Sequence, residues 1–141
     1  MLYLHKVLPI YTKMEKQYFP RENYIQRIKP FINKDIIKVL VGQRRVGKSY
    51  MLFQLMDYIK ENFDEPKIIY INKELSEFSE IETSKNLTDF VKTIAEKGKT
   101  NFLFIDEIQD INGFEAALRS LLAEGNFDIY CTGSNEKMLS R

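Results

Sequence analysis

The chain has 141 residues, of which 44% are hydrophobic and 29% are charged, and its formal net charge is +1 at pH 7. This length predicts one domain with one core, and no apolar run is long enough to cross a bilayer, so we expect no membrane partner. The single cysteine, Cys131, excludes an intrachain disulfide and, with the single His5, excludes a zinc site.

The leading segment, residues 1–34, is expected to contain a short helix. It lacks the pattern of a signal peptide, so we expect a cytoplasmic location. Residues 1–48 carry 11 Lys and Arg against 3 Asp and Glu, a net +8, whereas residues 49–141 carry 10 against 17, a net −7. The basic part could contact nucleic acid or an acidic partner, or form a solvated face. It has no aromatic-interleaved binding pattern, so nucleic acid stays an unsupported option.

The core domain is expected to span residues 35–141 and to begin with a strand. Asp35 to Val41 is an apolar, β-branched run, and the next eight residues, 42–49, read Gly-Gln-Arg-Arg-Val-Gly-Lys-Ser. Apolar residues then recur at helical spacing: Leu52, Leu55, Met56, Ile59 and Phe63. A strand, a glycine loop and a helix in this order predict a phosphate-binding loop.

The residue types of this loop suit a nucleoside triphosphate with Mg²⁺. Gly42 and Gly47 leave the backbone N–H groups open to the polyphosphate. Lys48 can reach the β- and γ-phosphates, and the Ser49 hydroxyl can take a place on Mg²⁺. The predicted nucleotide-binding residues are Gly42, Gln43, Arg44, Arg45, Val46, Gly47, Lys48, Ser49 and Tyr50.

Two sets of residues near the loop have open roles. Arg44 and Arg45 could touch phosphate, a neighbouring subunit or solvent. Tyr18, Phe19 and Arg21 lie upstream of the first core strand and could cover the adenine.

The middle of the chain continues as strand and helix in alternation. Lys67 to Ile71 predicts a second strand. The acidic stretch 74–82 is expected to be an exposed connector. A helix follows, marked by Leu87, Phe90, Val91 and Ile94, and we expect Gly98 to stop it.

A buried strand is predicted at residues 101–107, and it ends in two carboxylates. Asp106 stands at its carboxyl end, where ligands collect in open α/β sheets, and we expect it to coordinate Mg²⁺ directly or indirectly. Glu107 is expected to point the other way and to act as general base toward an attacking water. The alternative is an ordinary polar strand end.

The last two elements are a helix and a strand. Asn112 and Glu115 form the pattern of a capping box before an apolar helix that Gly125 should stop. Phe127 to Thr132 predicts another inner strand. Ser134 and Asn135 follow it, and either could sense the γ-phosphate or the attacking water, while Asn135 could instead cap a helix.

Three motifs together resemble a known family. They are the loop at 42–49, the stretch Phe-Ile-Asp-Glu-Ile-Gln-Asp at 104–110 with the helix start Gly113-Phe114-Glu115, and the stretch from Asp128 to Arg141. The chain is similar to predicted prokaryotic AAA+-type ATPases that carry a domain of unknown function behind the ATPase module. The resemblance implies that Lys48 and Ser49 bind ATP and Mg²⁺, that Asp106 and Glu107 form the second motif, and that Ser134 holds the sensor position.

The expected fold is a three-layer α/β/α P-loop NTPase with a parallel sheet. By the resemblance, the strand order is 2-3-4-1, a fifth strand is missing, and the chain is an N-terminal fragment whose parent continues into a C-terminal domain. The leading functional hypothesis is a Mg²⁺-dependent ATPase that drives conformational change. A nucleotide-dependent binding switch and a DNA-associated motor or loader are the alternatives, and homo-oligomerisation is left open.

Overall fold

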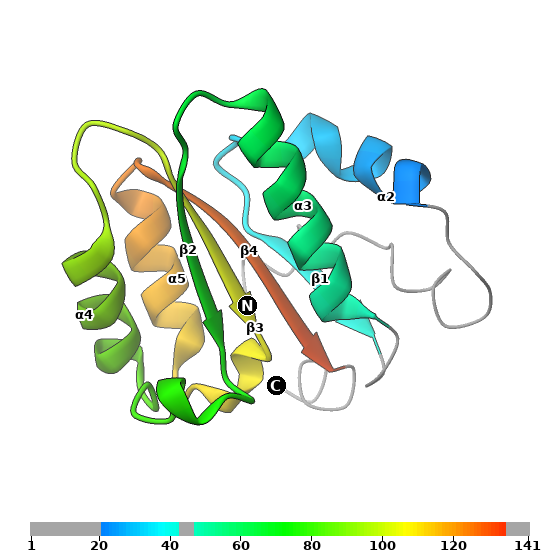
Figure 1. The fold of residues 1–141 in the computed structure, drawn as a ribbon. Coiled ribbons are helices and arrows are strands. Elements are labelled where there is room, and N and C mark those ends of the chain that lie inside the picture. Colours follow the sequence, from blue (N-terminus) through cyan, green and yellow to red (C-terminus); the bar gives the residue numbers. More distant parts are fainter. Residues whose placement is uncertain (1–20, 43–46, 135–141) are drawn as a thin grey trace.

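Four parallel strands form the sheet at the centre of the molecule (Figure 1). The computed structural model describes residues 21–42 and 47–134. The strands are β1 (Lys38–Gly42), β2 (Lys67–Asn72), β3 (Asn101–Asp106) and β4 (Phe127–Ser134). Their order is β1-β4-β3-β2, which confirms the predicted order. Because every neighbouring pair is parallel, all carboxyl ends meet at one edge of the sheet.

Helices cover both faces of the sheet, so the described part of the chain has three layers (Figure 1). One face is covered by α2 (Arg21–Ile28), the 3₁₀ turn η2 (Lys29–Phe31) and α3 (Lys48–Asn62); the other is covered by α4 (Ser84–Ile94) and α5 (Phe114–Ala123). Two further 3₁₀ turns, η3 (Ser76–Phe78) and η4 (Ile108–Asp110), follow the ends of β2 and β3. This is the predicted α/β/α arrangement.

The alternation of side chains along β3 explains why two cores form. Leu103 and Ile105 belong to the cluster beneath α4 and α5. Phe102 and Phe104 belong to the cluster beneath α3, where the Phe104 ring stacks on Tyr130 with 4.7 Å between centroids. Every residue of β3 is buried, as expected for a strand covered on both faces.

Two predicted helix boundaries were wrong. The capping box expected at Asn112 is absent, because α5 begins after Gly113, whose φ of 70° is left-handed and which caps the helix without a side-chain bond. The Asn112 N–H instead donates to the carbonyl oxygen of Glu82, at 2.8 Å. Helix α4 ends at Ile94, four residues before Gly98, because Ala95 is already extended. Gly98 therefore lies in a later turn, where its φ is 80°.

The first strand begins at Lys38, three residues later than the apolar run from Asp35. Lys38 is fully buried and forms an ion pair with Asp128 at the amino edge of the sheet. Its ammonium also lies 4.6 Å from the centroid of the Tyr130 ring. Burial lowers the pKa of Lys38, while Asp128 acts in the opposite direction. The pair joins β1 to β4 at the edge opposite the glycine loop.

Candidate active site

The glycine loop begins at the carboxyl end of β1 and leads into α3. Gly42 closes β1 and is in register with Ser134 of β4. Gly47 precedes α3 with a φ of 81°, a left-handed conformation that glycine adopts without strain. Gln43, Arg44, Arg45 and Val46 lie outside the described residues, so their roles stay predictions. The described ends of the loop still place the start of α3 beside the end of β4.

Lys48, the first residue of α3, reaches across to β4. Its side chain is only 6% exposed, and Nζ donates to the carbonyl oxygen of Gly133 at 3.0 Å. The N-terminus of a helix also carries partial positive charge. The described part of the loop therefore concentrates positive charge at the carboxyl edge of the sheet, where an anionic ligand would be stabilised.

Asp106 is the centre of the contacts at this edge. It ends β3 and is 1% exposed. Its Oδ2 accepts hydrogen bonds from the Ser49 hydroxyl and, at 3.4 Å, from the Tyr70 hydroxyl. Its Oδ1 accepts from the Thr132 hydroxyl at 2.5 Å. The structure thus brings together Ser49 and Asp106, the two residues predicted to hold a metal.

Glu107 leaves the strand in an unusual backbone conformation. Its φ and ψ are 61° and 54°, the left-handed region that non-glycine residues rarely adopt. Its N–H donates to the Thr132 hydroxyl oxygen at 3.0 Å, and its Oε1 accepts from Nε2 of Gln109 at 2.9 Å. Such outliers gather at functional sites because the surrounding structure must hold them in place.

Ser134, the predicted sensor, lies at the end of β4 and is nearly buried. Its backbone N–H donates to Oε1 of Gln109 at 3.3 Å, so Gln109 bridges Glu107 and Ser134. Asn135 lies outside the described residues. Tyr50, predicted to bind nucleotide, is 54% exposed on the first turn of α3.

The pKa of the Tyr70 hydroxyl is sensitive to the charge of the neighbouring Asp106 carboxylate. Burial, as the larger cause, and the nearby Asp106 carboxylate together raise the pKa of Tyr70 to about 12. The phenol therefore stays protonated at neutral pH and serves as a hydrogen-bond donor to the carboxylate.

Sequence reasoning missed three residues of this site: Thr132, Gln109 and Tyr70. Thr132 contacts both carboxylate residues, because the register of β3 and β4 pairs Ile105 with Cys131 and so brings the next residues of the two strands together. A polar residue at the end of an inner strand was a usable signal for Thr132. The motif at 104–110 contains Gln109 but did not indicate its contacts, and Tyr70 gave no signal, since these contacts depend on a turn and on a neighbouring strand.

The oxygen donors at this edge suit Mg²⁺. A hydroxyl and a carboxylate are hard ligands, and Mg²⁺ at phosphate sites commonly takes one or two protein oxygens and completes its shell with phosphate and water. Within residues 21–42 and 47–134 no cluster of three His, Cys, Asp or Glu side chains could hold a metal on its own.

Residues 34–141 match the family model described as the AAA domain. The chain belongs to the AAA domain family. Membership indicates nucleotide binding and, for the family, ATPase-type activity. The geometry above agrees with this, because the groups that a phosphate site needs, an ammonium, a hydroxyl and a carboxylate, meet at one edge of the sheet.

Two relatives extend the comparison. An uncharacterized protein of Haemophilus influenzae is 37% identical over 132 residues, covering 90% of this chain and 32% of the relative. An uncharacterized protein of Methanocaldococcus jannaschii is 32% identical over 150 aligned positions, covering 96% of this chain and 32% of the relative. The AAA domain chain thus spans about a third of the length of each.

A solved structure supports the fold. The Caenorhabditis elegans protein PCH-2 is similar with a TM-score of 0.55 and 20% sequence identity, over 86% of this chain and 36% of the other. At this identity the similarity concerns the fold alone. It agrees with the parallel sheet and flanking helices of this AAA domain.

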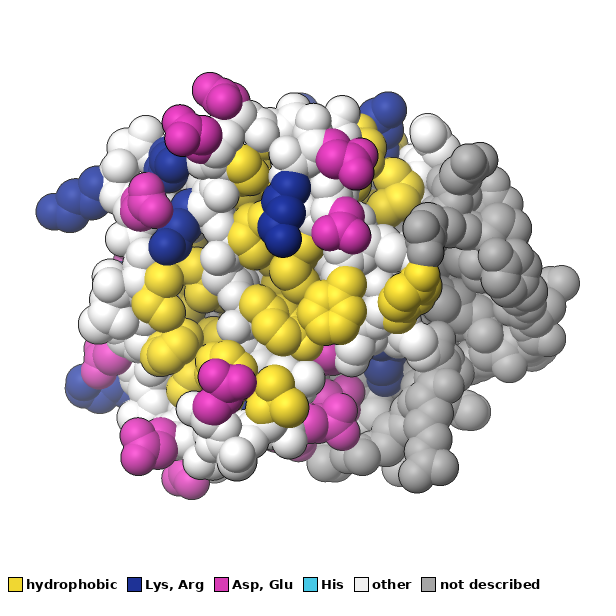
Figure 2. All heavy atoms as spheres, in the orientation of Figure 1, with side chains coloured by type: hydrophobic (Ala, Val, Ile, Leu, Met, Phe, Trp, Pro, Cys, Tyr) yellow, Lys and Arg dark blue, Asp and Glu magenta, His cyan; other side chains and the backbone are white. Residues whose placement is uncertain are grey.

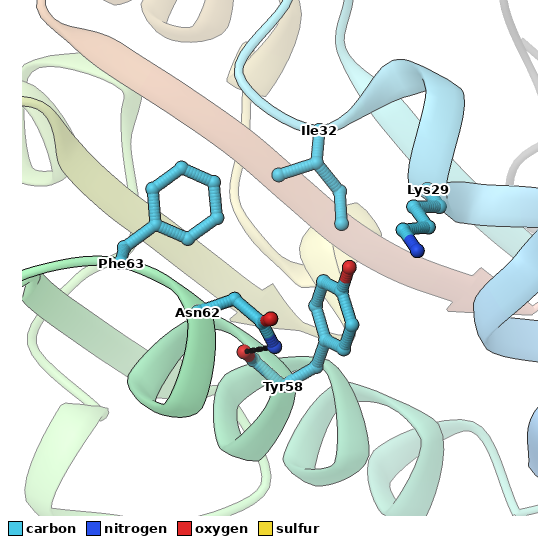
Figure 3. Close-up of a pocket in the computed structure, with 5 residues that line it drawn as sticks. All are labelled: Lys29, Ile32, Tyr58, Asn62 and Phe63. Carbon is cyan, nitrogen blue, oxygen red and sulfur yellow. Dashed lines mark hydrogen bonds between the residues drawn. The ribbon is translucent and has the colours of Figure 1, made fainter.

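A hollow lies away from the carboxylates, at the other end of α3 from Lys48 (Figure 3). Its volume is about 240 Å³, and it is lined by Lys29, Ile32, Tyr58, Asn62 and Phe63.

The exposed face between α3 and β2 also carries hydrophobic side chains (Figure 2), including Phe53, whose ring lies 5.3 Å from Tyr70. Among the described residues, no helix combines the length and the hydropathy needed to cross a membrane.

Proposed function

We propose that this chain binds ATP with Mg²⁺, and that the full-length protein hydrolyses ATP to drive conformational change in an attached or partner module. The observation that carries the proposal is the hydrogen bond from the Ser49 hydroxyl to the Asp106 carboxylate. It joins the helix after the glycine loop to the end of β3. This contact supports one shared site for phosphate and metal.

The binding roles follow from the chemistry of each group. Lys48 would face the β- and γ-phosphates, exchanging its bond to Gly133 for bonds to phosphate oxygens. Ser49 and Asp106 would hold Mg²⁺, which neutralises charge on the phosphates when bound. The backbone N–H groups of residues 42–47 would cradle the phosphates, and Gly47 carries no Cβ that would obstruct them.

The hydrolytic role falls to Glu107. As the oxygen of water bonds to the γ-phosphorus and the bond to the β-phosphate oxygen breaks, the Glu107 carboxylate would accept the proton of that water. Ser134, at the end of the neighbouring strand, would contact the γ-phosphate or the water. Its short hydrogen-bonded path to Glu107 through Gln109 supports a joint role.

A nucleotide-dependent switch with little turnover is the second candidate. It is favoured by one observation: one oxygen of the Glu107 carboxylate is already engaged by the Gln109 amide, so only the other oxygen could accept a proton from water. The relatives are about three times as long as the aligned region, which supports an attached module as the element that responds in either case.

Steady-state phosphate release by the full-length protein tests the proposal, with Mg²⁺ or a chelator and with or without DNA. Lys48→Ala should lower the affinity for a fluorescent ATP analogue by ~10-fold or more, because it removes the charge facing the phosphates. Asp106→Asn should weaken the dependence on Mg²⁺. Lys60→Ala, an exposed change late in α3, is the control.

Each outcome separates the candidates. Binding and release that are unchanged in Lys48→Ala would overturn the nucleotide site itself. Tight binding with negligible release would favour the switch. Stimulation of release by DNA, weakening as salt increases, would favour a DNA-associated motor or loader.

A further inference from the structure

Gln109 is a buried polar side chain that the proposed hydrolytic steps leave without a role of its own. It lies in η4, two residues after Glu107, and is only 6% exposed. Both ends of its amide are used: Nε2 donates to Glu107 Oε1 at 2.9 Å, and Oε1 accepts from the Ser134 N–H at 3.3 Å. A buried amide with both ends satisfied across two strand ends is costly to misplace.

The backbone around Glu107 gives this bridge its significance. The left-handed conformation of Glu107 turns the chain out of β3, and bonds from its N–H to Thr132 and from the Asp110 N–H to its carbonyl oxygen hold that turn. These bonds fix the main chain. They do not fix the direction of the carboxylate, whereas the Gln109 amide contacts the carboxylate itself.

We propose that Gln109 is a positioning residue that ties the Glu107 carboxylate to the end of β4, so that a ligand contacting Ser134 changes the direction in which the carboxylate points. This rests on the proposed function of Glu107 as general base. Gln109 neither takes nor gives a proton in the reaction. It acts through Glu107, and its effect is on the orientation of the carboxylate toward water.

The chemistry of an amide explains why glutamine suits this position. One side chain must donate to a carboxylate and accept from a backbone N–H, and a neutral primary amide does both. Methionine has a similar length and neither function. Glutamate keeps an acceptor toward Ser134 but loses the donor and places a second negative charge against Glu107.

The first test compares these two substitutions in the full-length protein. Gln109→Met should lower kcat by roughly 10- to 100-fold, the loss expected when a catalytic group is misdirected, with the KM for ATP unchanged. Gln109→Glu should lower kcat further. Gln26→Met, an exposed change on α2, is the matched control and should leave kcat unchanged. Equal losses in both variants with a raised KM would indicate a general structural defect and overturn the proposal.

A double-mutant cycle with Glu107 is the decisive measurement. If Gln109 acts through Glu107, Gln109→Met should change kcat by less than about twofold once Glu107→Gln is present, because the group it directs is gone. Losses that multiply in the double variant would overturn the proposal.

Hydrogen exchange keeps the inference separate from the proposed function. If Glu107→Gln hydrolyses ATP like the parent, Glu107 is not the base, and the double-mutant cycle then measures no coupling in kcat. The bridge itself is then measured by exchange of the Ser134 amide. Gln109→Met should speed that exchange by ~10-fold or more, since the N–H loses its acceptor. Unchanged exchange would overturn the bridge whatever the enzyme does.

Discussion

Asp106 and Glu107 are consecutive carboxylates with different surroundings. The Asp106 oxygens accept bonds from three hydroxyl groups, those of Ser49, Tyr70 and Thr132. Glu107 instead contacts an amide and occupies a left-handed turn. The hydroxyl groups around Asp106 suit a carboxylate that binds a metal. The amide of Gln109 engages one oxygen of Glu107, and the other oxygen could accept a proton. The residue types predicted two different roles for this pair, and those roles stay predictions.

Glu107→Gln is expected to preserve binding of Mg²⁺ and ATP and to slow hydrolysis by roughly 10²- to 10⁴-fold, the usual contribution of a positioned general base. Single-turnover hydrolysis and nucleotide titration of the full-length protein check this. Glu77→Gln, on the exposed turn η3, is the control for loss of one surface charge. Hydrolysis at the parent rate in Glu107→Gln would mean that the base lies elsewhere.

Tyr70 provides a pH prediction. Its pKa of about 12 lies above the value of 10.0 for an unperturbed tyrosine. A group whose pKa is raised on folding adds stability that is complete below pH 10 and is lost as pH rises through 12. Ultraviolet titration, with Tyr70→Phe to identify the signal, should therefore show one tyrosine that ionises late.

The same titration separates the two causes of the raised pKa. Asp106→Asn should lower the pKa of Tyr70 but leave it above 10, because burial is the larger cause and persists. Asp57→Asn, an exposed change on α3, is the control. A Tyr70 pKa that does not respond to Asp106→Asn would contradict the contact between the two side chains.

At the scale of elements, the periodic patterns predicted the helices and strands of the structure, whereas the residues expected to begin or end two helices were wrong. The four parallel strands were predicted because apolar runs alternate with helical patterns, whereas their order was expected from the resemblance to a known ATPase family. The capping box at Asn112 was wrong because a left-handed Gly113 can start a helix by itself. The contacts of Gln109 could not be predicted, since they depend on how the turn after β3 lies beside the end of β4.

The capping box that the structure does contain is at α4. The Thr83 hydroxyl accepts from the Asn86 N–H at 3.1 Å, and the Asn86 side chain accepts from the Thr83 N–H at 3.2 Å. Thr83→Ala should therefore lower the free energy of unfolding by about 1 kcal/mol. Urea denaturation measures this, with Thr93→Ala in the last turn of α4 as the control. Equal effects of the two changes would show that the cap adds nothing.

At the scale of the whole molecule, the two edges of the sheet hold polar clusters of different kinds. The carboxyl edge carries the candidate site, where buried groups contact one another across α3, β3 and β4. The amino edge carries the Lys38–Asp128 ion pair, which is supported by the Asn33 N–H at 2.9 Å and the Tyr130 hydroxyl at 2.5 Å. Within the described part of the chain this second cluster contacts no residue proposed for catalysis, and we assign it to the pairing of β1 with β4.

Asp128→Ala is expected to lower the free energy of unfolding by roughly 3–5 kcal/mol, because it leaves the Lys38 ammonium buried without its partner. Replacing both residues, as Lys38→Met with Asp128→Leu, should recover most of the loss. Asp89→Ala, which breaks an exposed pair with Lys85, should cost at most about 1 kcal/mol. Urea denaturation compares the three, and similar losses in the two Asp→Ala variants would contradict the burial argument.

The pairing of β1 with β4 also bears on how the protein is made. β1 is the first of the four described strands to leave the ribosome, yet its neighbour in the sheet is the last of the four, and Lys48 contacts Gly133 across 85 positions of sequence. A nascent chain that ends before β4 therefore has the glycine loop but lacks the strand that Lys48 and Asp106 contact. The candidate site is therefore completed only after β4 has emerged and can pair with β1 and β3.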